Sequence, residues 1–318
     1  MLLTPRTVLF AGRRAGLAGT RTLLPSFHLS HNNNSWKQKL STATSTTTTA
    51  FSVKDNGVAT LELQRPAMDL KFWDEFARAV QVLSGDSKVR CVLLASTGKV
   101  FSFGLDVKDK KQVEVLTGKE LDPARKSEVL RRFVGRLQDS FTALERAPPV
   151  IACVHSYCIG GAMDLICAAD IRYATKDASF SIKEVDVGLC PDLGTLQRIE
   201  RIVKSSSLVR ELAFTGRQMG AEEALACGFV SRVFDTREEM MSAAAALAET
   251  IARKSPIAVS GIKENLNYSR GRPVEESLKY QATWSACALQ AVDVEKGLAT
   301  AAAGGKGAPL EFANLPKQ

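Results

Sequence analysis

The sequence has little of the chemistry that metal sites and disulfides require. Only 3 of its 318 residues are histidine, and His28 and His31 both lie near the N-terminus. The remaining one, His155, has no second ligand at the spacing of a zinc site, so we expect no metal. The 7 cysteines are scattered through apolar segments without a CxxC pair, which is typical of reduced thiols in a compartment that is not oxidising.

Long hydrophobic runs are absent as well. No segment approaches the ~20 consecutive apolar residues that a membrane-spanning helix requires, so we expect no membrane partner. The sequence also lacks the glycine-rich motifs of nucleotide binding, the nucleophile elbow of serine hydrolases and the HExxH motif of metallopeptidases. With 45% hydrophobic and 24% charged residues, the composition is that of a globular protein with a sizeable core.

The N-terminal segment has no acidic residue before Asp55. Its basic residues supply most of the net charge of +8, so the rest of the chain is near neutral and we expect no nucleic acid partner. Spaced arginines followed by the run STATSTTTT are typical of an organelle transit peptide. We therefore predict a mitochondrial transit peptide and a disordered Ser/Thr-rich tail over residues 1–50; a secretory signal and a tail without function are the alternatives.

The C-terminal sequence FANLPKQ does not carry a peroxisomal signal of the SKL type. Together with the N-terminal segment, this predicts a location in the mitochondrial matrix.

Hydrophobic periodicity predicts strands that alternate with helices, followed by helices alone. The strands are expected at 57–66, 89–97, 150–154 and 171–174, and the longer helices at 69–86, 119–146, 206–215, 221–226, 237–254, 256–268 and 273–302. This order indicates an α/β core over residues 51–250 and a helical region over 251–318. The C-terminal helices have enough apolar residues to pack either on their own core or on a partner subunit.

Two turns that contain glycine follow predicted strands. They are FSFGLD (101–106) and CIGGAMD (158–164). Glycine lets another group approach the backbone closely, and the free N–H groups at a helix start favour negative charge. Two such turns could direct two N–H donors at one oxygen and form an oxyanion hole. Ordinary turns with glycine for conformational reasons are the alternative.

Three carboxylates lie near these turns in the sequence: Asp164, Glu184 and Asp192. The last two belong to SIKEVDVGLCPDLG, whose apolar residues are expected to be interior. Burial would raise the pKa of such carboxylates toward the range of general acids and bases. The alternative is that each acid is a structural partner of a basic residue, for which Arg172, Lys183 and Arg198 are candidates. Asp186, in the same stretch, is interpreted as structural or exposed.

The segments that carry these residues resemble the crotonase (enoyl-CoA hydratase/isomerase) family. KVFSFGLDVKD, PPVIACVHSYCIGGAMDLICAADIRYAT and FSIKEVDVGLCPDLGTLQRI are similar to the family's landmark segments in order and spacing, and the resemblance covers roughly Val53 to Ala302. It implies a crotonase-like spiral of ββα turns over 51–250 and a helical C-terminal trimerisation region, with trimers or hexamers as the assembly. It also implies an acyl-CoA thioester as substrate.

The resemblance further implies roles for individual residues. The thioester oxygen would be held by the backbone N–H groups of Phe103 and Gly161, although the family usually has a small residue at the first position. Substrate contacts would come from Gly161 and from Phe103, Gly104, Leu105, Asp106 and Val107. The resemblance requires no cofactor and no metal, since coenzyme A is part of the substrate.

Within the family, the closest likeness is to members that isomerise dienoyl-CoA thioesters, because these carry an acid where hydratases have a small neutral residue, here Asp192. In such a reaction Glu184 would handle the proton at C2, Asp192 would deliver one at C6, and Asp164 would tune the pair. The resemblance thus implies isomerisation of 3,5-dienoyl-CoA to 2,4-dienoyl-CoA in the β-oxidation of unsaturated fatty acids. An enoyl-CoA hydratase is the first alternative, and a non-catalytic protein that binds acyl-CoA or RNA is the second.

Overall fold

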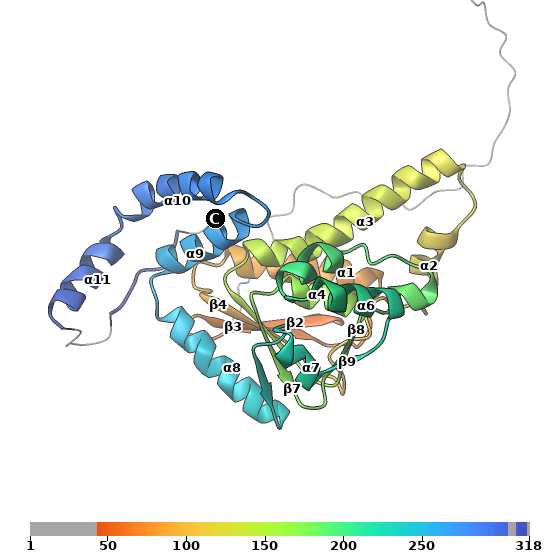
Figure 1. Ribbon diagram of the computed structural model, residues 1–318, viewed down its shortest axis with the longest axis horizontal. Coiled ribbons are helices and arrows are strands. Elements are labelled where there is room, and N and C mark those ends of the chain that lie inside the picture. The colour runs from red at the N-terminus through yellow and green to blue at the C-terminus, as the bar shows by residue number, and fades with distance from the viewer. Residues whose placement is uncertain (1–42, 305–309, 317–318) are drawn as a thin grey trace, which may run out of the picture. The chain divides into compact units, whose positions relative to one another are not determined.

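The computed structural model describes residues 43–304 and 310–316. Most of the predicted transit peptide therefore lies outside the described residues. The strands form two sheets (Figure 1). The larger has, in spatial order, β1 (Ala43–Ser45), β2 (Thr49–Val53), β3 (Val58–Leu63), β4 (Cys91–Ser96), β5 (Val150–Val154), β7 (Ile171–Thr175) and β10 (Arg232–Phe234). The smaller has β6 (Tyr157–Ile159), β8 (Ser179–Ser181) and β9 (Met219–Gly220).

Eleven α-helices lie within the described ranges. They are α1 (Leu70–Gly85), α2 (Lys110–Thr117), α3 (Pro123–Arg146), α4 (Gly161–Cys167), α5 (Thr195–Arg198), α6 (Ser206–Thr215), α7 (Ala221–Ala226), α8 (Arg237–Ala252), α9 (Pro256–Tyr268), α10 (Val274–Ala288) and α11 (Val292–Ala302). Short 3₁₀ helices span Lys183–Val187 and Ile199–Arg201. The predicted α/β class with C-terminal helices is confirmed, and α6, α7 and α9 occupy the predicted residues.

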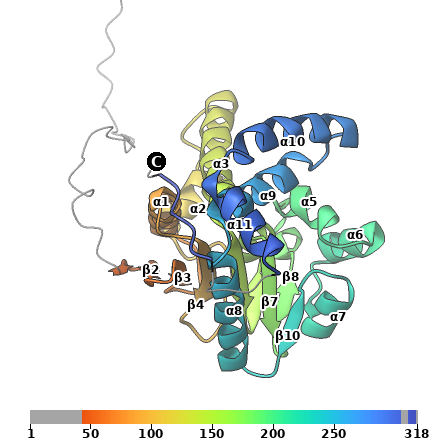
Figure 2. The same ribbon diagram turned by 90° about the vertical axis from the view of Figure 1, so that its left-hand side faces the viewer.

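The core lies on both faces of the parallel strands β3, β4, β5, β7 and β10. Every residue of β4 is buried, and its side chains alternate between two clusters. Val92 and Leu94 join the large cluster that includes residues of α1 and α3. Leu93 faces the other way and packs with the alanines of α8, which covers that face of the sheet (Figure 2). Burial on both faces explains why these strands are continuous apolar runs.

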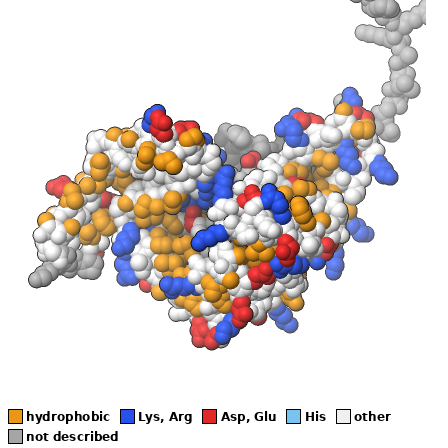
Figure 3. Space-filling model, in the orientation of Figure 1, with side chains coloured by type: hydrophobic (Ala, Val, Ile, Leu, Met, Phe, Trp, Pro, Cys, Tyr) orange, Lys and Arg blue, Asp and Glu red, His pale blue; other side chains and the backbone are white. Residues whose placement is uncertain are grey.

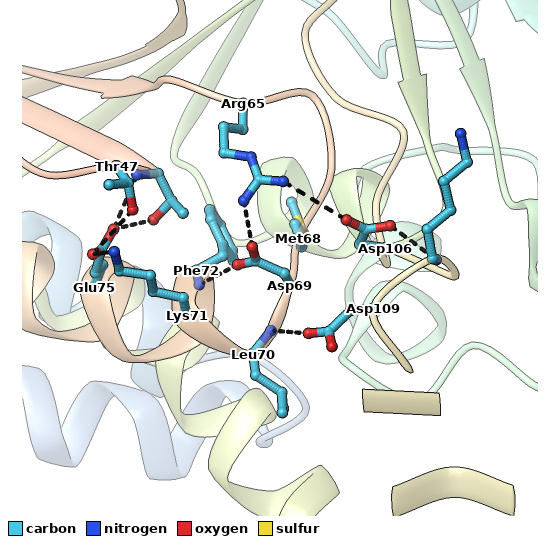
Figure 4. A network of polar contacts seen from close by, with 12 residues as sticks. Thr47, Arg65, Met68, Asp69, Leu70, Lys71, Phe72, Glu75, Asp106 and Asp109 are labelled. Atoms are coloured by element: carbon cyan, nitrogen blue, oxygen red, sulfur yellow. Dashed lines mark hydrogen bonds and ion pairs between the residues drawn. The ribbon is translucent and has the colours of Figure 1, made fainter. Parts of the chain in front are cut away.

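The fold starts earlier than the sequence predicted. The β1–β2 hairpin begins at Ala43, whereas the core was expected to begin near Phe51. Its threonines are β-branched and favour strands. Glu75 of α1 accepts hydrogen bonds from the hydroxyl of Thr46 at 2.7 Å and the amide of Thr48 at 3.0 Å, and these contacts hold the hairpin to the domain. Figure 4 shows Glu75 beside Thr47 of the same hairpin. From the sequence, this run of threonines was interpreted as part of a tail. The residue that holds the run in place could not be found there, because the acceptor Glu75 lies far away in the sequence.

Two helical predictions also differ from the structure. Helix α2 was not predicted; Asp109 caps its N-terminus by accepting from the amides of Lys111 and Gln112. The single helix predicted over 273–302 is divided into α10 and α11 by a break at residues 289–291. No residue of either helix is buried in the single chain, and Leu278 and Leu298 are 62% and 67% exposed.

None of the helices within the described ranges is both long and apolar enough to span a membrane.

Candidate active site

The two glycine turns predicted from the sequence meet in the structure. Gly104 has φ +74°, and a Cβ at this position would lie 2.6 Å from the amide nitrogen of Gly161 and 2.7 Å from the carbonyl oxygen of Ile159. Any larger residue would push the turns apart. Gly161 is the first residue of α4, so its N–H has no acceptor within the helix.

The N–H group of Phe103 is not available for a substrate, which corrects the sequence prediction. It donates to the carbonyl oxygen of Pro66 at 2.6 Å. Phe103 is 47% exposed, and the centroid of its ring lies 5.9 Å from that of Tyr157. The side chain of Phe103 therefore belongs to the surface near the turn. The first N–H donor of the predicted oxyanion hole must come from another residue.

Leu105 presents a suitable N–H group instead. Its segment forms a parallel bridge with Met68, which uses the carbonyl of Gly104 and the N–H of Asp106. In such a bridge the amide of the middle residue points to the opposite side. The Leu105 nitrogen lies 3.8 Å from the position that a Cβ on Gly161 would take. Leu105 therefore replaces Phe103 as the candidate that would form, with Gly161, the predicted pair of donors.

Polar contacts fix the segment that carries Leu105 (Figure 4). Arg65 forms ion pairs with Asp69 and Asp106. Asp109 accepts a hydrogen bond at 3.0 Å from the amide of Leu70, which connects the segment to the start of α1. The buried side chain of Gln112 adds a donor to the carbonyl oxygen of Met68 at 3.0 Å. Substrate contacts by Gly104, Leu105, Asp106 and Val107 stay predictions; Val107 is exposed.

Asp164 and Glu184 lie behind the second turn. Asp164, on α4, is 1% exposed, and its Oδ1 accepts from the amide of Thr195 at 2.6 Å. Oε1 of Glu184 lies 3.5 Å from the position of a Cβ on Gly160, so this carboxylate faces the Gly-Gly turn. Among the described residues, neither Oδ2 of Asp164 nor Oε2 of Glu184 has a hydrogen-bond partner, although both atoms are buried. Unsatisfied buried oxygens of this kind are available for chemistry.

The pKa values of all three carboxylates are raised, and charge acts in one direction, from Asp192 on Asp164 and from both of these on Glu184. Burial, together with the charges of Asp164 and Asp192, raises the pKa of Glu184 to about 7. Burial also raises the pKa of Asp164 to about 6, against the lowering effect of the Thr195 amide. Asp192 is exposed as a residue, yet loss of water around its carboxylate raises its pKa. That Asp164, Glu184 and Asp192 act together in catalysis stays a prediction.

The apolar neighbours of these acids are interior only in part. Ile182 and Leu193 are buried as expected. Val185, Val187 and Leu189 are 38%, 65% and 46% exposed. The Gly-Gly turn, which faces the carboxylate of Glu184, lies more than twenty positions earlier in the sequence. Asp186 is exposed and pairs with Lys183, as its structural interpretation predicted.

The basic residues considered as partners of the acids serve other groups. Arg198 donates from Nε to Oε1 of Glu145 at 2.9 Å and from Nη1 to the carbonyl of Leu193 at 3.3 Å. Arg172 donates to backbone carbonyls at the end of α4. Within the part of the chain that the structure describes, Asp164, Glu184 and Asp192 have no ion pair. Gln112 and Thr195 were not singled out from the sequence, because their partners, Met68 and Asp164, lie on other elements.

A sequence model described as enoyl-CoA hydratase/isomerase matches residues 53–302, which is most of the chain. The chain belongs to the enoyl-CoA hydratase/isomerase family. The range that the family model matches agrees with the resemblance of the motifs, which covers roughly Val53 to Ala302.

Similar members of the enoyl-CoA hydratase/isomerase family have more specific names. A mitochondrial Delta(3,5)-Delta(2,4)-dienoyl-CoA isomerase of Rattus norvegicus is 48% identical over 246 residues, 76% of this chain and 75% of the relative. The protein of the same name from Homo sapiens is 47% identical over 75% of this chain and 74% of the relative. Among solved structures, an enoyl-CoA hydratase of Mycobacterium smegmatis is similar with a TM-score of 0.70 and 25% identity, over 81% of this chain and 96% of that structure.

Gly104→Ala is expected to destabilise the protein and abolish its activity. The substitution combines a left-handed backbone with a Cβ 2.6 Å from a backbone nitrogen, and the two effects together cost about 3 kcal/mol. Thermal unfolding should show a lower midpoint. Gly135→Ala is the matched control: it lies within α3 with no atom within 4 Å of the added Cβ, so its midpoint should be unchanged or higher. Equal midpoints for both variants would contradict the close contact of the turns.

Proposed function

We propose that this chain isomerises 3,5-dienoyl-CoA to 2,4-dienoyl-CoA in the β-oxidation of unsaturated fatty acids. The observation that carries the proposal is the position of Asp192, whose charge raises the pKa values of both Asp164 and Glu184. A proton transfer between two distant carbons requires an acid near each of them, and Asp192 supplies the one that Glu184 cannot. The names of the relatives support the same reaction.

The proposed reaction begins at the thioester. The N–H groups of Leu105 and Gly161 hold its carbonyl oxygen and stabilise the charge that develops there. Glu184 removes a proton from C2, which gives a dienolate delocalised from the oxygen to C6. Asp192 delivers a proton to C6, and the double bonds move to the 2 and 4 positions. One proton leaves and one is added, so Asp192 must regain a proton from Glu184 or from solvent.

Asp164 is proposed to act through the other two acids. Its carboxylate raises the pKa of Glu184, which makes Glu184 a stronger base, and its bond to the Thr195 amide connects it to the loop that bears Asp192. The reaction as written transfers protons only, so we propose that it uses no cofactor and no metal.

We also propose that the protein acts in the mitochondrial matrix as a trimer or a hexamer. The relatives' names are mitochondrial. The exposed apolar residues of α10 and α11, such as Leu278 and Leu298, would be buried by a second subunit. Light scattering of the protein gives its mass in solution directly, and a monomer would contradict the assembly.

A paired assay tests the proposed reaction against the hydratase alternative. The purified protein is incubated separately with a 3,5-dienoyl-CoA and with a 2-enoyl-CoA, and absorbance is followed in the ultraviolet. The isomerase should produce a conjugated 2,4-diene from the first substrate. Robust hydration of the second substrate without isomerisation of the first would overturn the proposal. A protein that binds both substrates and converts neither would support a non-catalytic role.

The pH dependence of kcat/KM should be bell-shaped. The proposed step needs Glu184 ionised and Asp192 protonated. The three acids together must therefore hold one proton, and Asp192 rather than Glu184 must carry it. The last proton leaves with a pKa of about 7, and activity should therefore fall above neutral pH. It should also fall at low pH, where further protons neutralise the base. A profile that only rises through pH 7 to a plateau would exclude Asp192 as the donor.

A further inference from the structure

A cavity lined by arginines lies outside the candidate active site. It has a volume of about 320 Å³, at the lower end of the range of small-molecule sites. Its lining comes from the ends of β7, α5 and α9 and from the loop at Gly228, and neither glycine turn of the active site contributes. Four of its lining residues are arginines: Arg172, Arg198, Arg201 and Arg270.

The four guanidinium groups are close together. Arg198 and Arg270 donate to the same oxygen, Oε1 of Glu145, at 2.9 and 2.7 Å. Arg201 lies beside Gly271, where a Cβ would be 3.0 Å from its Nη2. Burial lowers the pKa of Arg172, the charge of Asp170 opposes this shift, and the charge of Arg270 adds to it. Neighbouring positive charges repel one another, so the arginines require a group of negative charge to compensate them.

The surrounding acids compensate this charge only in part. Asp170 is the one acid among the lining residues, and its Oδ2 is already occupied by Lys263 at 2.7 Å and by the Val150 amide at 2.8 Å. Glu145 serves two arginines with a single oxygen. Within the described residues, the hydrogen bonds of Arg172 all go to carbonyl oxygens, at 2.7–3.3 Å, and its guanidinium lies over the ring of Phe229. An excess of positive charge therefore faces the cavity. In Figure 3, basic side chains gather near the centre of the view, close to the junction of α9 and α10.

We propose that this arginine cavity binds a small phosphate-type dianion. A phosphate has three acceptor oxygens that several guanidinium groups can bind at once in their planar fork geometry. A single carboxylate offers fewer oxygens and one charge. Arg201 is the exposed member and the most accessible to an entering ion, while Arg172 and Arg198 are held in place by bonds to the backbone.

The test is calorimetric titration of the full chain with inorganic phosphate, with chloride at equal ionic strength as the reference. Arg201→Gln and Arg270→Gln should each weaken phosphate binding about tenfold or more, since each removes a charge-assisted hydrogen bond. Arg253→Gln is the matched control, because it makes the same change in net charge at an exposed position that does not line the cavity. Its affinity should stay within about twofold of the unaltered chain. Thermal unfolding without phosphate checks that all variants fold.

Hydrogen exchange locates the bound ion. Phosphate should slow exchange of amides in residues 195–203 and 268–272, which surround the cavity. Binding that is absent, that is equally weakened by Arg253→Gln, or that protects the turns at residues 101–106 and 158–164 would overturn the proposal. The last result would place phosphate in the acyl-CoA site instead. None of these outcomes depends on which reaction the enzyme catalyses.

Discussion

Glu184→Gln is expected to lower kcat for dienoyl-CoA isomerisation by about 10²- to 10⁴-fold, the usual contribution of a positioned general base. The amide keeps the size and the buried position of the side chain but cannot accept the C2 proton. Because the oxyanion donors belong to the backbone of Leu105 and Gly161, KM should change much less than kcat. Steady-state kinetics on 3,5-dienoyl-CoA measure both values.

The same variant should be as stable as the unaltered protein or more stable at pH 8. The pKa of Glu184 in the folded state is raised to about 7, above that of an ordinary glutamate. A raised pKa favours folding at low pH, and this contribution is lost as pH rises through about 7, because a charged group is then buried beside other acids. The amide removes that charge. A higher midpoint together with lost activity would separate catalysis from folding.

Asp186→Asn is the matched control for this prediction. It removes an acid two residues away, but Asp186 is exposed and paired with Lys183. Its kcat should stay close to that of the unaltered enzyme, since surface ion pairs contribute little. If Asp186→Asn lost as much activity as Glu184→Gln, the effect would come from the 3₁₀ helix as a whole, and the assignment of Glu184 as base would be wrong.

The sequence predicted those parts of the fold and site that depend on local pattern. Continuous apolar runs predicted β4 and β5 because each is buried on both faces. The glycine turns and the three acids were recognised from residue type and order. Asp164 and Glu184 lie behind the Gly-Gly turn, where burial raises the pKa of both and the charge of Asp164 also raises that of Glu184. Their catalytic roles stay predictions.

The parts that failed depend on contacts between remote segments. Phe103 was chosen as donor by its place in the motif, but its N–H is bound to Pro66, 37 positions earlier in the chain. Leu105 is available only because Met68 pairs with the residues on either side of it. The Thr-rich hairpin required Glu75 as acceptor. Residue type does not encode these partners, so the sequence could not identify them.

Asp192→Asn is expected to leave a folded protein that has lost isomerase activity, by about 10²-fold or more. Asp192 is exposed, and its contact with Gln138 uses the backbone carbonyl oxygen, at 2.6 Å, which the substitution keeps. The fold should therefore be unaffected, and the unfolding midpoint should stay near that of the unaltered chain. The measurement is the rate of formation of the conjugated 2,4-diene, with far-ultraviolet circular dichroism as a check on folding.

The comparison of Asp192→Asn with Glu184→Gln separates the two candidate reactions. Hydration of a 2-enoyl-CoA needs two acids around one water, and Asp164 with Glu184 could supply them; isomerisation also needs a donor near C6. Any hydratase activity should therefore be lost in Glu184→Gln and retained in Asp192→Asn, whereas isomerisation should be lost in both. The Asn variant should also lower the pKa of Glu184, since Asp192 no longer raises it. Full isomerase activity in Asp192→Asn would make Asp192 a structural residue and require another proton donor at C6.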